Sequence, residues 1–166
     1  STDGTRDLLR TIPESPRLQF YYLPKNRGKG AALREGFTHV TGEIALVQDA
    51  DLEYDPADYP ELVAPIRDGV ADVVYGTRLT GGKPQQVHMF WHKVGNRLLS
   101  LFTNFLYNTT LTDMETGYKV IRADLLRELR LRSNGFSIEP EITAKILRKK
   151  WRLYEVPIRY YGRTYA

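Results

Sequence analysis

Cysteine is absent from the 166 residues of the sequence. Disulfide bridges, thiolate zinc sites, iron–sulfur clusters and cysteine nucleophiles are therefore excluded, and the chain suits a reducing compartment. Long apolar runs are also missing, because the longest, at 98–107, is only half of the ~20 residues that a membrane-spanning helix needs. The first residues lack the basic and then apolar pattern of a secretion signal. We expect a cytoplasmic protein that lies, at most, against the cytoplasmic face of a membrane.

Internal repeats, low-complexity tracts and Pro/Ser-rich linkers are absent too, so we expect a single domain over residues 1–166. Hydrophobic residues make up 42% and charged residues 27% of the chain, as in ordinary globular proteins. The net charge of +4 permits anionic partners such as nucleotides or phospholipids. We expect no nucleic-acid partner, because the basic residues are scattered among acidic ones and no nucleic-acid-binding motif occurs.

Strand-like and helix-like stretches alternate along the chain. Apolar or alternating runs predict strands at 18–23, 44–48, 72–76 and 154–161. Helical spacing and capping residues predict helices from Asp3 or Thr2 to Leu9, over 29–42, behind Asp55-Pro56, and over 93–107 and 138–150. Strands interleaved with helices indicate an α/β sheet with parallel members. Because the chain begins at what reads as a strand-to-helix turn, we expect the first strand to be missing.

Carboxylates follow the apolar run 44–48 directly. Asp49 and Asp51 are two residues apart at the end of this expected buried strand, and Glu53 follows two residues further on. Alternate residues project to the same side, and an open α/β sheet binds its ligands at the carboxyl ends of its strands. Oxygen ligands there suit a hard divalent cation that bridges substrate phosphates. The alternative is a solvated acidic loop, against which the basic segment upstream argues.

That basic segment spans residues 24–32, between an expected strand and an expected helix. Its glycines allow the backbone to approach a ligand closely. Lys25, Arg27 and Lys29 supply positive charge near a helix N-terminus, which favours anions. The glycine spacing matches neither the dinucleotide fingerprint nor the P-loop. The alternative is a plain strand–turn–helix junction.

An ordered set of segments resembles one known family. The segments are NRGKGAALREG, QDADLEYDP, YGTRLTGG, LTDMETGYK, FSIEPEITAKI and EVPIRYYGRTY. Over nearly its whole length the chain is similar to family 2 of the inverting glycosyltransferases, in the branch of polyprenyl-phosphate (dolichol-phosphate) mannosyl- and glucosyltransferases. The resemblance implies a GT-A fold, which is a Rossmann-like α/β domain with an open, mixed, mainly parallel sheet flanked by helices, here incomplete at both ends.

The resemblance also implies a donor site. In the family the D-x-D pair holds Mg²⁺ or Mn²⁺ on the diphosphate of a nucleotide sugar, which assigns the metal to Asp49 and Asp51. Glu53 stands at a third metal-side position where dolichol enzymes often have glutamine. The implied donor-binding residues are Asp3, Gly28, Lys29, Asp49, Ala50 and Asp51. Whether the donor is a GDP- or a UDP-hexose stays open.

Further positions implied by the resemblance complete the catalytic set. Arg78 and Arg163 match family arginines that contact phosphates, a task that suits the bidentate fork of arginine. Asp113 matches a family aspartate near the sugar and the acceptor, and Glu115 is a weaker candidate. Asp113 would be a general base for a hydroxyl acceptor, or a positioning residue for a lipid phosphate, which needs no base. A helix or turn cap is the third reading.

The acceptor side falls, by the same analogy, on residues 79–107, with Arg97 and Lys119 as acceptor-binding residues. Large apolar residues lie nearly all round the expected helix over 93–107, beside basic ones. This composition suits a phosphate-headed isoprenoid at a membrane surface, so we expect residues 88–107 at an exposed edge. A buried core helix and a homodimer face are the alternatives.

We therefore expect a metal-dependent, inverting transfer of a hexose from a nucleotide-diphosphate sugar to a polyprenyl phosphate or another hydroxyl acceptor. Two alternatives remain. One is a nucleotidyltransferase that makes a sugar nucleotide, which would need a Gly-rich phosphate loop on its first strand that this sequence does not show. The other is a non-catalytic fragment that binds a partner or dimerises.

Overall fold

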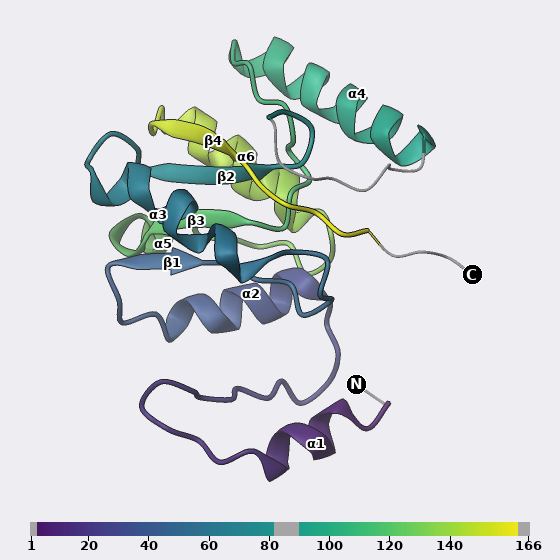
Figure 1. Cartoon of the computed structure of the whole chain (residues 1–166), viewed down its shortest axis with the longest axis vertical. Helices are drawn as coiled ribbons and strands as arrows, with labels where there is room; N and C mark the ends of the chain where they lie inside the picture. The colour runs from purple at the N-terminus through teal and green to yellow at the C-terminus, as the bar shows by residue number, and fades with distance from the viewer. Residues whose placement is uncertain (1–2, 82–89, 163–166) are drawn as a thin grey trace.

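One four-stranded sheet organises the computed structural model, which describes residues 3–81 and 90–162 and, within helix α4 (Phe90–Tyr107), side chains from Val94 onward. The strands are β1 (Ile44–Leu46), β2 (Val73–Thr77), β3 (Lys119–Arg122) and β4 (Leu153–Pro157). Their order across the sheet is β1-β3-β2-β4, and helices flank the sheet (Figure 1). The expected α/β fold class is confirmed.

Strand direction follows from the position of β3. This strand lies between β1 and β2 and runs antiparallel to both, whereas β4 pairs with β2 in parallel, from Val73 opposite Leu153 to Thr77 opposite Pro157. β1, β2 and β4 therefore point the same way, as a mainly parallel, mixed sheet requires. Although three strands share a direction, only β2 and β4 form a parallel pair among the described strands. The reason is that the antiparallel strand β3 separates β1 from β2.

The central strand β3 and the helix after it, α5 (Ala123–Leu129), are not predicted by the sequence pattern. Val120 and Ile121 are fully buried, but Lys119 interrupts the short apolar run that would otherwise mark a strand. Lys119 is only 1% exposed, which the residue type does not predict, because lysine is almost never buried unless it is paired.

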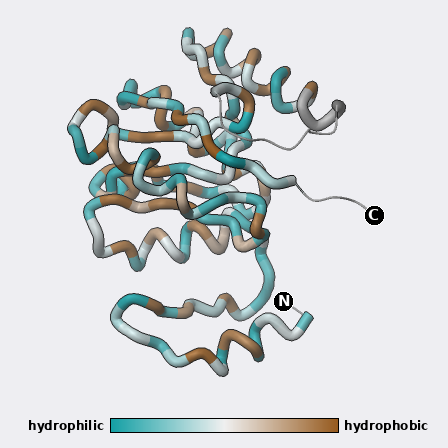
Figure 2. The backbone as a smooth tube through the Cα atoms, viewed as in Figure 1, coloured by the Kyte–Doolittle hydropathy of each residue, from teal (hydrophilic) through white to brown (hydrophobic). Residues whose placement is uncertain are grey.

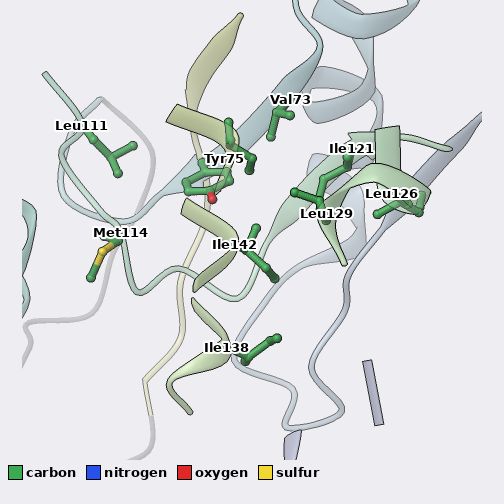
Figure 3. Packing of buried hydrophobic residues seen from close by; sticks show 11 residues of the cluster. Val73, Tyr75, Leu111, Met114, Ile121, Leu126, Leu129, Ile138 and Ile142 are labelled. Carbon is green, nitrogen blue, oxygen red and sulfur yellow. The ribbon is translucent and has the colours of Figure 1, made fainter. Parts of the chain in front are cut away.

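Helices cover both faces of the sheet. α2 (Lys29–Thr38), α5 and α6 (Ile138–Arg148) pack on one face, and α3 (Tyr59–Arg67), preceded by the 3-10 turn η1 (Pro56–Asp58), packs on the other. Val73, Tyr75 and Ile121 point toward Ile138 and Ile142 of α6 (Figure 3). The intervening strand residues point toward α3, because successive side chains of a strand alternate between faces.

The expected helices are confirmed in type, with small shifts in their ends. The helix behind Asp55-Pro56 begins as the sequence indicates, because the Asp55 side chain accepts the N–H of Ala57 and proline occupies the first helical position. The first helix, α1 (Thr5–Thr11), begins after Asp3, whose Oδ1 accepts the N–H of Thr5 at 3.1 Å.

The prediction of a strand at 18–23 is wrong. This stretch and α1 form an arm that lies beside α2 and away from the sheet, and only the isolated bridge between Ser15 and Leu18 pairs there (Figures 1 and 2). Leu18, Tyr21 and Tyr22 are 43%, 47% and 38% exposed. β-propensity reports how well side chains fit a pleated, half-buried surface, and no strand in the described part of the chain supplies such a surface here.

One edge of the sheet collects the segments that the sequence singles out. The carboxyl ends of β1, β2 and β4 lie at this edge, since the three strands point the same way. The amino end of β3 joins them there, because β3 runs in the opposite direction. The QDADLE segment, the GTR segment and the TDMETG segment therefore meet, although long stretches of sequence separate them.

Candidate active site

A cavity of about 510 Å³ opens at this edge of the sheet. Its walls come from the turns after β1 and β2, the segment before β3, the chain after β4, and helices α2, α4 and α6. The residues that line it are Lys29, Asp49, Asp51, Glu53, Tyr54, Arg78, Leu79, Gly95, Asn96, Leu99, Glu115, Phe136, Glu139 and Tyr160. The three carboxylates expected to hold a metal, one expected donor-site lysine and one expected phosphate-binding arginine thus share one cavity.

Asp49 is positioned by uncharged neighbours in addition to the Lys29 ammonium, which lies 2.8 Å from Oδ2. The side-chain carbonyl of Gln48 accepts hydrogen bonds from the hydroxyls of Tyr59 and Tyr118, at 2.8 and 2.7 Å. Its amide N–H donates to the backbone carbonyl of Asp49 at 2.6 Å. The Asp49 carboxylate rests against Gly117, where a Cβ would lie 2.5 Å from Oδ2. Only glycine at position 117 leaves room for the carboxylate as it lies.

Asp51 and Glu53 reach the same cavity through a tight turn. Leu52 between them has a φ of 60°, and Asp51 Oδ1 accepts the N–H of Glu53 at 3.2 Å. The hydroxyl of Tyr160 donates a hydrogen bond to Glu53 Oε2. Across residues 3–81 and 90–162, no three carboxylate or imidazole groups come together as a ready-made metal site.

The carboxylates nevertheless fit Mg²⁺ or Mn²⁺. Asp49 and Asp51 present hard oxygen donors to a cavity with room for more ligands. Mg²⁺ retains several waters and is usually bound through one or two carboxylates together with substrate phosphates, so an incomplete protein site is what this ion requires. Assignment of the metal to Asp49, Asp51 and Glu53 stays a prediction.

Arg78 and Asp113 form a buried, bidentate ion pair. Arg78 Nε and Nη2 each lie 2.8 Å from an oxygen of Asp113, and the backbone N–H of Arg78 donates to Oδ2 at 2.9 Å. Asn96 Nδ2 of α4 donates to Oδ1 at 2.6 Å. Burial alone would raise the pKa of Asp113, but the hydrogen bonds and charge of Arg78 outweigh it and lower that pKa. Asp113 is therefore held as a carboxylate with its oxygens occupied, which disfavours the role of a general base.

Glu115 is the acid of this segment that reaches the cavity. It is partly buried and lines the wall, whereas Asp113 is fully buried behind the wall. Burial, and then the charge of Glu139, raise the pKa of Glu115. The order of preference that the sequence indicates, Asp113 before Glu115, is thus reversed for direct contact with a bound molecule.

The glycines of the basic segment serve the fold. A Cβ on Gly28 would lie 2.6 Å from the carbonyl oxygen of Asn134, and one on Gly30 would lie 2.4 Å from that of Ser133. The N–H of Ala31 donates to the carbonyl of Asn134 at 3.1 Å. The N-terminus of α2 is therefore covered in part by the loop at 133–135, and the expectation that these glycines bring the backbone to a ligand is corrected for this face.

A groove of about 490 Å³ adjoins the cavity along the arm. Lys29 and Phe136 line both spaces, and Phe136 is 80% exposed where they meet. Tyr21 and Tyr22 line the groove together with Lys25, Arg27, Gly28 and other residues of the arm. The groove thus combines aromatic surface with positive charge, next to the carboxylates of the cavity.

Other expected site residues lie elsewhere. The Asp3 carboxylate accepts hydrogen bonds from Thr5 at the start of α1 and Ala50 is exposed, and neither residue lines the cavity or the groove. Arg97 is exposed on α4 beside the cavity-lining Asn96. Lys119 does not reach the cavity, because its ammonium is buried against Glu139, which corrects its assignment to the acceptor. Arg163 lies outside the described residues.

Several cavity residues escape the sequence reasoning. Glu139 reads as an acid in the first turn of a helix, yet it is 4% exposed and lies between two lysines. Asn96 recurs with Ser100 and Thr103 at helical spacing in a largely apolar helix, and this polar stripe is the signal that could have found it. Tyr160 and Phe136 carry no such signal, because aromatic residues in a strand or loop usually belong to the core.

Comparisons with known proteins agree on a family. Residues 1–130 match the family model described as glycosyl transferase family 2. The chain is 31% identical over 170 residues to the undecaprenyl-phosphate mannosyltransferase of Micrococcus luteus, with 98% of this chain and 69% of that protein covered. It is 29% identical over 164 residues to glycosyltransferase AglJ of Haloferax volcanii, and there it spans about half of the relative, 52% of its length.

Solved structures agree on the fold. The crystal structure of glucosyl-3-phosphoglycerate synthase from Mycobacterium tuberculosis with phosphoglyceric acid matches with a TM-score of 0.66 and 18% identity, over 99% of this chain and 59% of that one. The same enzyme with Mn²⁺, UDP-glucose and phosphoglyceric acid matches with a TM-score of 0.61 and 17% identity, over 94% and 51%. These likenesses place the sheet and its helices in the GT-A fold. With the family model matched over residues 1–130, the chain belongs to glycosyl transferase family 2.

Proposed function

We propose that this chain forms the catalytic core of a metal-dependent, inverting glycosyltransferase that transfers a hexose from a nucleoside-diphosphate sugar to a polyprenyl phosphate. The observation that carries the proposal is the shared cavity, in which Asp49 and Asp51 lie with Lys29 and Arg78. The two carboxylates suit a divalent metal ion, and the positive charges of Lys29 and Arg78 suit the phosphates that such an ion accompanies. Membership of the family supports the same activity.

The donor would lie across the junction of the cavity and the groove. Its nucleoside fits the groove, where Tyr21 and Tyr22 offer aromatic surface beside Lys25 and Arg27. Its diphosphate would then fall next to Lys29, which lines both spaces, and its hexose would enter the cavity toward Glu115. A divalent ion bound by Asp49 and Asp51 would neutralise negative charge that develops on the departing diphosphate.

The transfer needs no general base in this arrangement. An ionised phosphate oxygen of the acceptor attacks the anomeric carbon, the bond from that carbon to the diphosphate oxygen breaks, and its electron pair leaves with the nucleoside diphosphate. This single displacement inverts the anomeric configuration. Asp113 is then a positioning residue, because it holds the Arg78 guanidinium at the cavity wall through a bidentate contact.

Helix α4 supports a lipid acceptor through an inverted pattern. Its small, uncharged polar side chains face the protein: Ser100 and Thr103 are 3% and 8% exposed, and Asn104 donates to the carbonyl of Leu111 at 2.8 Å. Its large apolar side chains face outward, and those exposed by 46% to 83% are Leu98, Leu99, Leu101, Phe102, Phe105 and Leu106. The expectation of an exposed apolar edge is confirmed for the described part of this segment, and a buried core helix is excluded.

A membrane surface with its polyprenyl phosphate is the occupant that we assign to this face. The apolar face is continuous with the active site, because Gly95, Asn96 and Leu99 of the same helix line the cavity. An isoprenoid on α4 would therefore present its phosphate at the cavity. The Micrococcus luteus relative, named for undecaprenyl phosphate, supports that acceptor class. None of the helices described here combines the length and apolarity needed to cross a bilayer.

Calorimetry tests the proposal at its metal and donor. We expect that titration of UDP or GDP in the presence of Mn²⁺ shows an affinity at least about tenfold lower for Asp51→Ala than for the unaltered protein, because one metal ligand is lost. Asp68→Ala, which removes an exposed carboxylate far from the cavity, is the matched control and should bind normally. Equal metal-dependent affinity in Asp51→Ala and Asp68→Ala would contradict the proposed function.

A further inference from the structure

Charges of alternating sign run from the core of the protein to the cavity. The ammonium of Lys119, on β3, forms an ion pair with Glu139 of α6. The other oxygen of Glu139 lies 2.8 Å from the ammonium of Lys29, on α2. That ammonium in turn donates a hydrogen bond to Asp49 Oδ2, also at 2.8 Å. The series therefore ends on a carboxylate that the proposed function assigns to the metal.

The inner end of this series is fixed. Lys119 is 1% exposed, and its ammonium also donates to the backbone carbonyls of Met114 and Thr116 and lies 4.7 Å from the centre of the Tyr75 ring. Burial lowers the pKa of Lys119, and the charge of Glu139 opposes that shift. A buried ammonium and a buried carboxylate stay together because separating them would leave an uncompensated charge in the core.

The outer end is free to exchange partners. The Lys29 side chain is 20% exposed and lines both the cavity and the groove. The oxygens of Glu139 meet the two ammonium groups as ion pairs, without the alignment of regular hydrogen bonds. Lys29 is thus tethered by Glu139 and can turn its remaining donors toward either Asp49 or an anion in the cavity.

We propose that Lys29, held in place by Glu139, makes binding of the divalent cation conditional on the nucleoside diphosphate. Without the diphosphate, the ammonium of Lys29 competes with the cation for Asp49 Oδ2. With the diphosphate bound, its oxygens offer Lys29 another anionic partner, and Asp49 becomes available. The cation and the diphosphate therefore strengthen each other's binding beyond their direct contact. This inference rests on the proposed function, because it takes Asp49 as a metal ligand.

The inference predicts an effect that a donor-binding lysine alone would not produce. A lysine that only contacts phosphate leaves the affinity of the protein for the metal alone unchanged. A lysine that competes with the metal for Asp49 weakens that affinity, so removing the lysine strengthens metal binding. Glu139 acts as a positioning residue in this scheme, because it shares the Lys29 ammonium with Asp49. Without Glu139, Asp49 is the sole carboxylate partner of Lys29 among the contacts described above.

Manganese binding in the absence of nucleotide gives the decisive measurement. For Lys29→Met we expect the affinity for Mn²⁺ alone, followed by electron paramagnetic resonance, to rise about tenfold. The affinity for UDP or GDP without metal should fall, so the coupling between the two ligands decreases. Arg27→Met is the matched control: it removes a positive charge from the same segment without touching Asp49. A rise of equal size in Arg27→Met, or none in Lys29→Met, would overturn the inference.

A charge-neutral double variant tests the role of Glu139. Glu139→Gln with Lys119→Met removes the buried pair together, so that no unpaired charge is left in the core. We expect the affinity of the double variant for Mn²⁺ alone to fall, opposite to the effect of Lys29→Met. The reason is that Lys29 then pairs with Asp49 and no longer with Glu139. A rise in that affinity would contradict the role of Glu139, and Lys29→Met decides the competition by itself if the double variant does not fold.

Asp49→Asn separates this inference from the proposed function. If Asp49→Asn leaves Mn²⁺ binding unchanged, the metal assignment itself is wrong. If Asp49→Asn abolishes binding and Lys29→Met does not alter it, only the competition is wrong, and the proposed function stands.

Discussion

Besides the ion pair with Lys29, uncharged residues position Asp49. Gln48 is fixed by two tyrosine hydroxyls and holds the Asp49 backbone, while Gly117 leaves room for the Asp49 carboxylate. Asp113 shows the opposite case, since a guanidinium occupies both of its oxygens. The two aspartates of this region thus have different surroundings: both oxygens of Asp113 are held by Arg78, whereas Asp49 lines the cavity and contacts the partly exposed Lys29 through Oδ2.

Gly117→Ala tests this steric control at the residue scale. The added methyl group would lie 2.5 Å from Asp49 Oδ2 and 3.0 Å from the Tyr54 ring, so the carboxylate must move. We expect the Mn²⁺-dependent affinity for UDP or GDP to fall about tenfold. Overpacking should also lower the free energy of unfolding by ~1–3 kcal/mol.

Gly36→Ala is the control for Gly117→Ala. A Cβ at Gly36 meets nothing within 4 Å, and its position inside α2 means that alanine should stabilise the protein slightly. Calorimetry and urea unfolding of both variants give the comparison. If the two variants bind the nucleotide equally well, Gly117 does not position Asp49.

At the scale of elements, α4 is built with its polar side inward. Asn96, Ser100 and Thr103 recur at helical spacing on the side that meets Asp113 and Met114. In a surface helix of a soluble protein the apolar residues would take that side. An exposed apolar stripe of this size marks an interaction surface, and its continuity with the cavity favours a lipid.

Leu98→Glu combined with Phe102→Glu tests the surface of α4. Both side chains are exposed, at 61% and 62%, so we expect the variant to remain folded, with an unchanged melting temperature. Sedimentation with anionic liposomes should be lost, because carboxylates cannot enter the acyl region and are repelled by the headgroups. Leu8→Glu with Val70→Glu adds the same charge at exposed positions elsewhere and should leave sedimentation intact. A change from dimer to monomer in the α4 variant would identify a homodimer face instead.

The first turn of α6 gives a pH dependence of stability. Glu141 accepts hydrogen bonds from the backbone N–H groups of Arg132 and Ser133, and from Lys145 one turn later. Burial opposes ionisation, but these donors prevail and lower the pKa of Glu141 from 4.5 to about 2. The unfolded chain therefore takes up this proton at a higher pH than the folded protein does, and acid favours unfolding.

We expect the Glu141 contribution to be complete above pH 4.5 and to disappear as the pH falls toward 2. Urea unfolding of the unaltered protein and of Glu141→Gln, measured at several pH values, provides the test. The difference in the free energy of unfolding should be largest near neutral pH and should shrink through this window. A difference that stays constant with pH would show that the charge of Glu141 contributes nothing.

At the scale of the whole molecule, one reversed strand assembles the site. β3 brings its amino end, with Gly117 and Glu115 before it, to the edge where β1, β2 and β4 end. The arm and α2 border one side of that edge, and α4 borders the other (Figure 1). Donor and acceptor would thus approach the cavity from different elements. The chain spans about half of the length of the AglJ relative, so the activity of the whole protein is a proposal.

Local pattern determined much of the architecture. The apolar runs 44–48 and 72–76 correspond to β1 and β2. The Asp55-Pro56 start signal precedes α3, and the isoleucines spaced four residues apart from Ile138 onward lie in α6. These elements follow from propensity, capping and periodicity, which act over a few residues. The ordered motifs likewise led to the family and to the carboxylates of the cavity.

Tertiary structure alone decided the rest. The run 18–23 has strand composition but no partner strand among the described residues, whereas β3 contains a lysine yet pairs on both sides. The roles of Lys119, Glu139 and Asp113 depend on which charge lies opposite each of them after folding. Strand pairing and the burial of charge are set by contacts between residues far apart in the chain, so no local pattern could specify them.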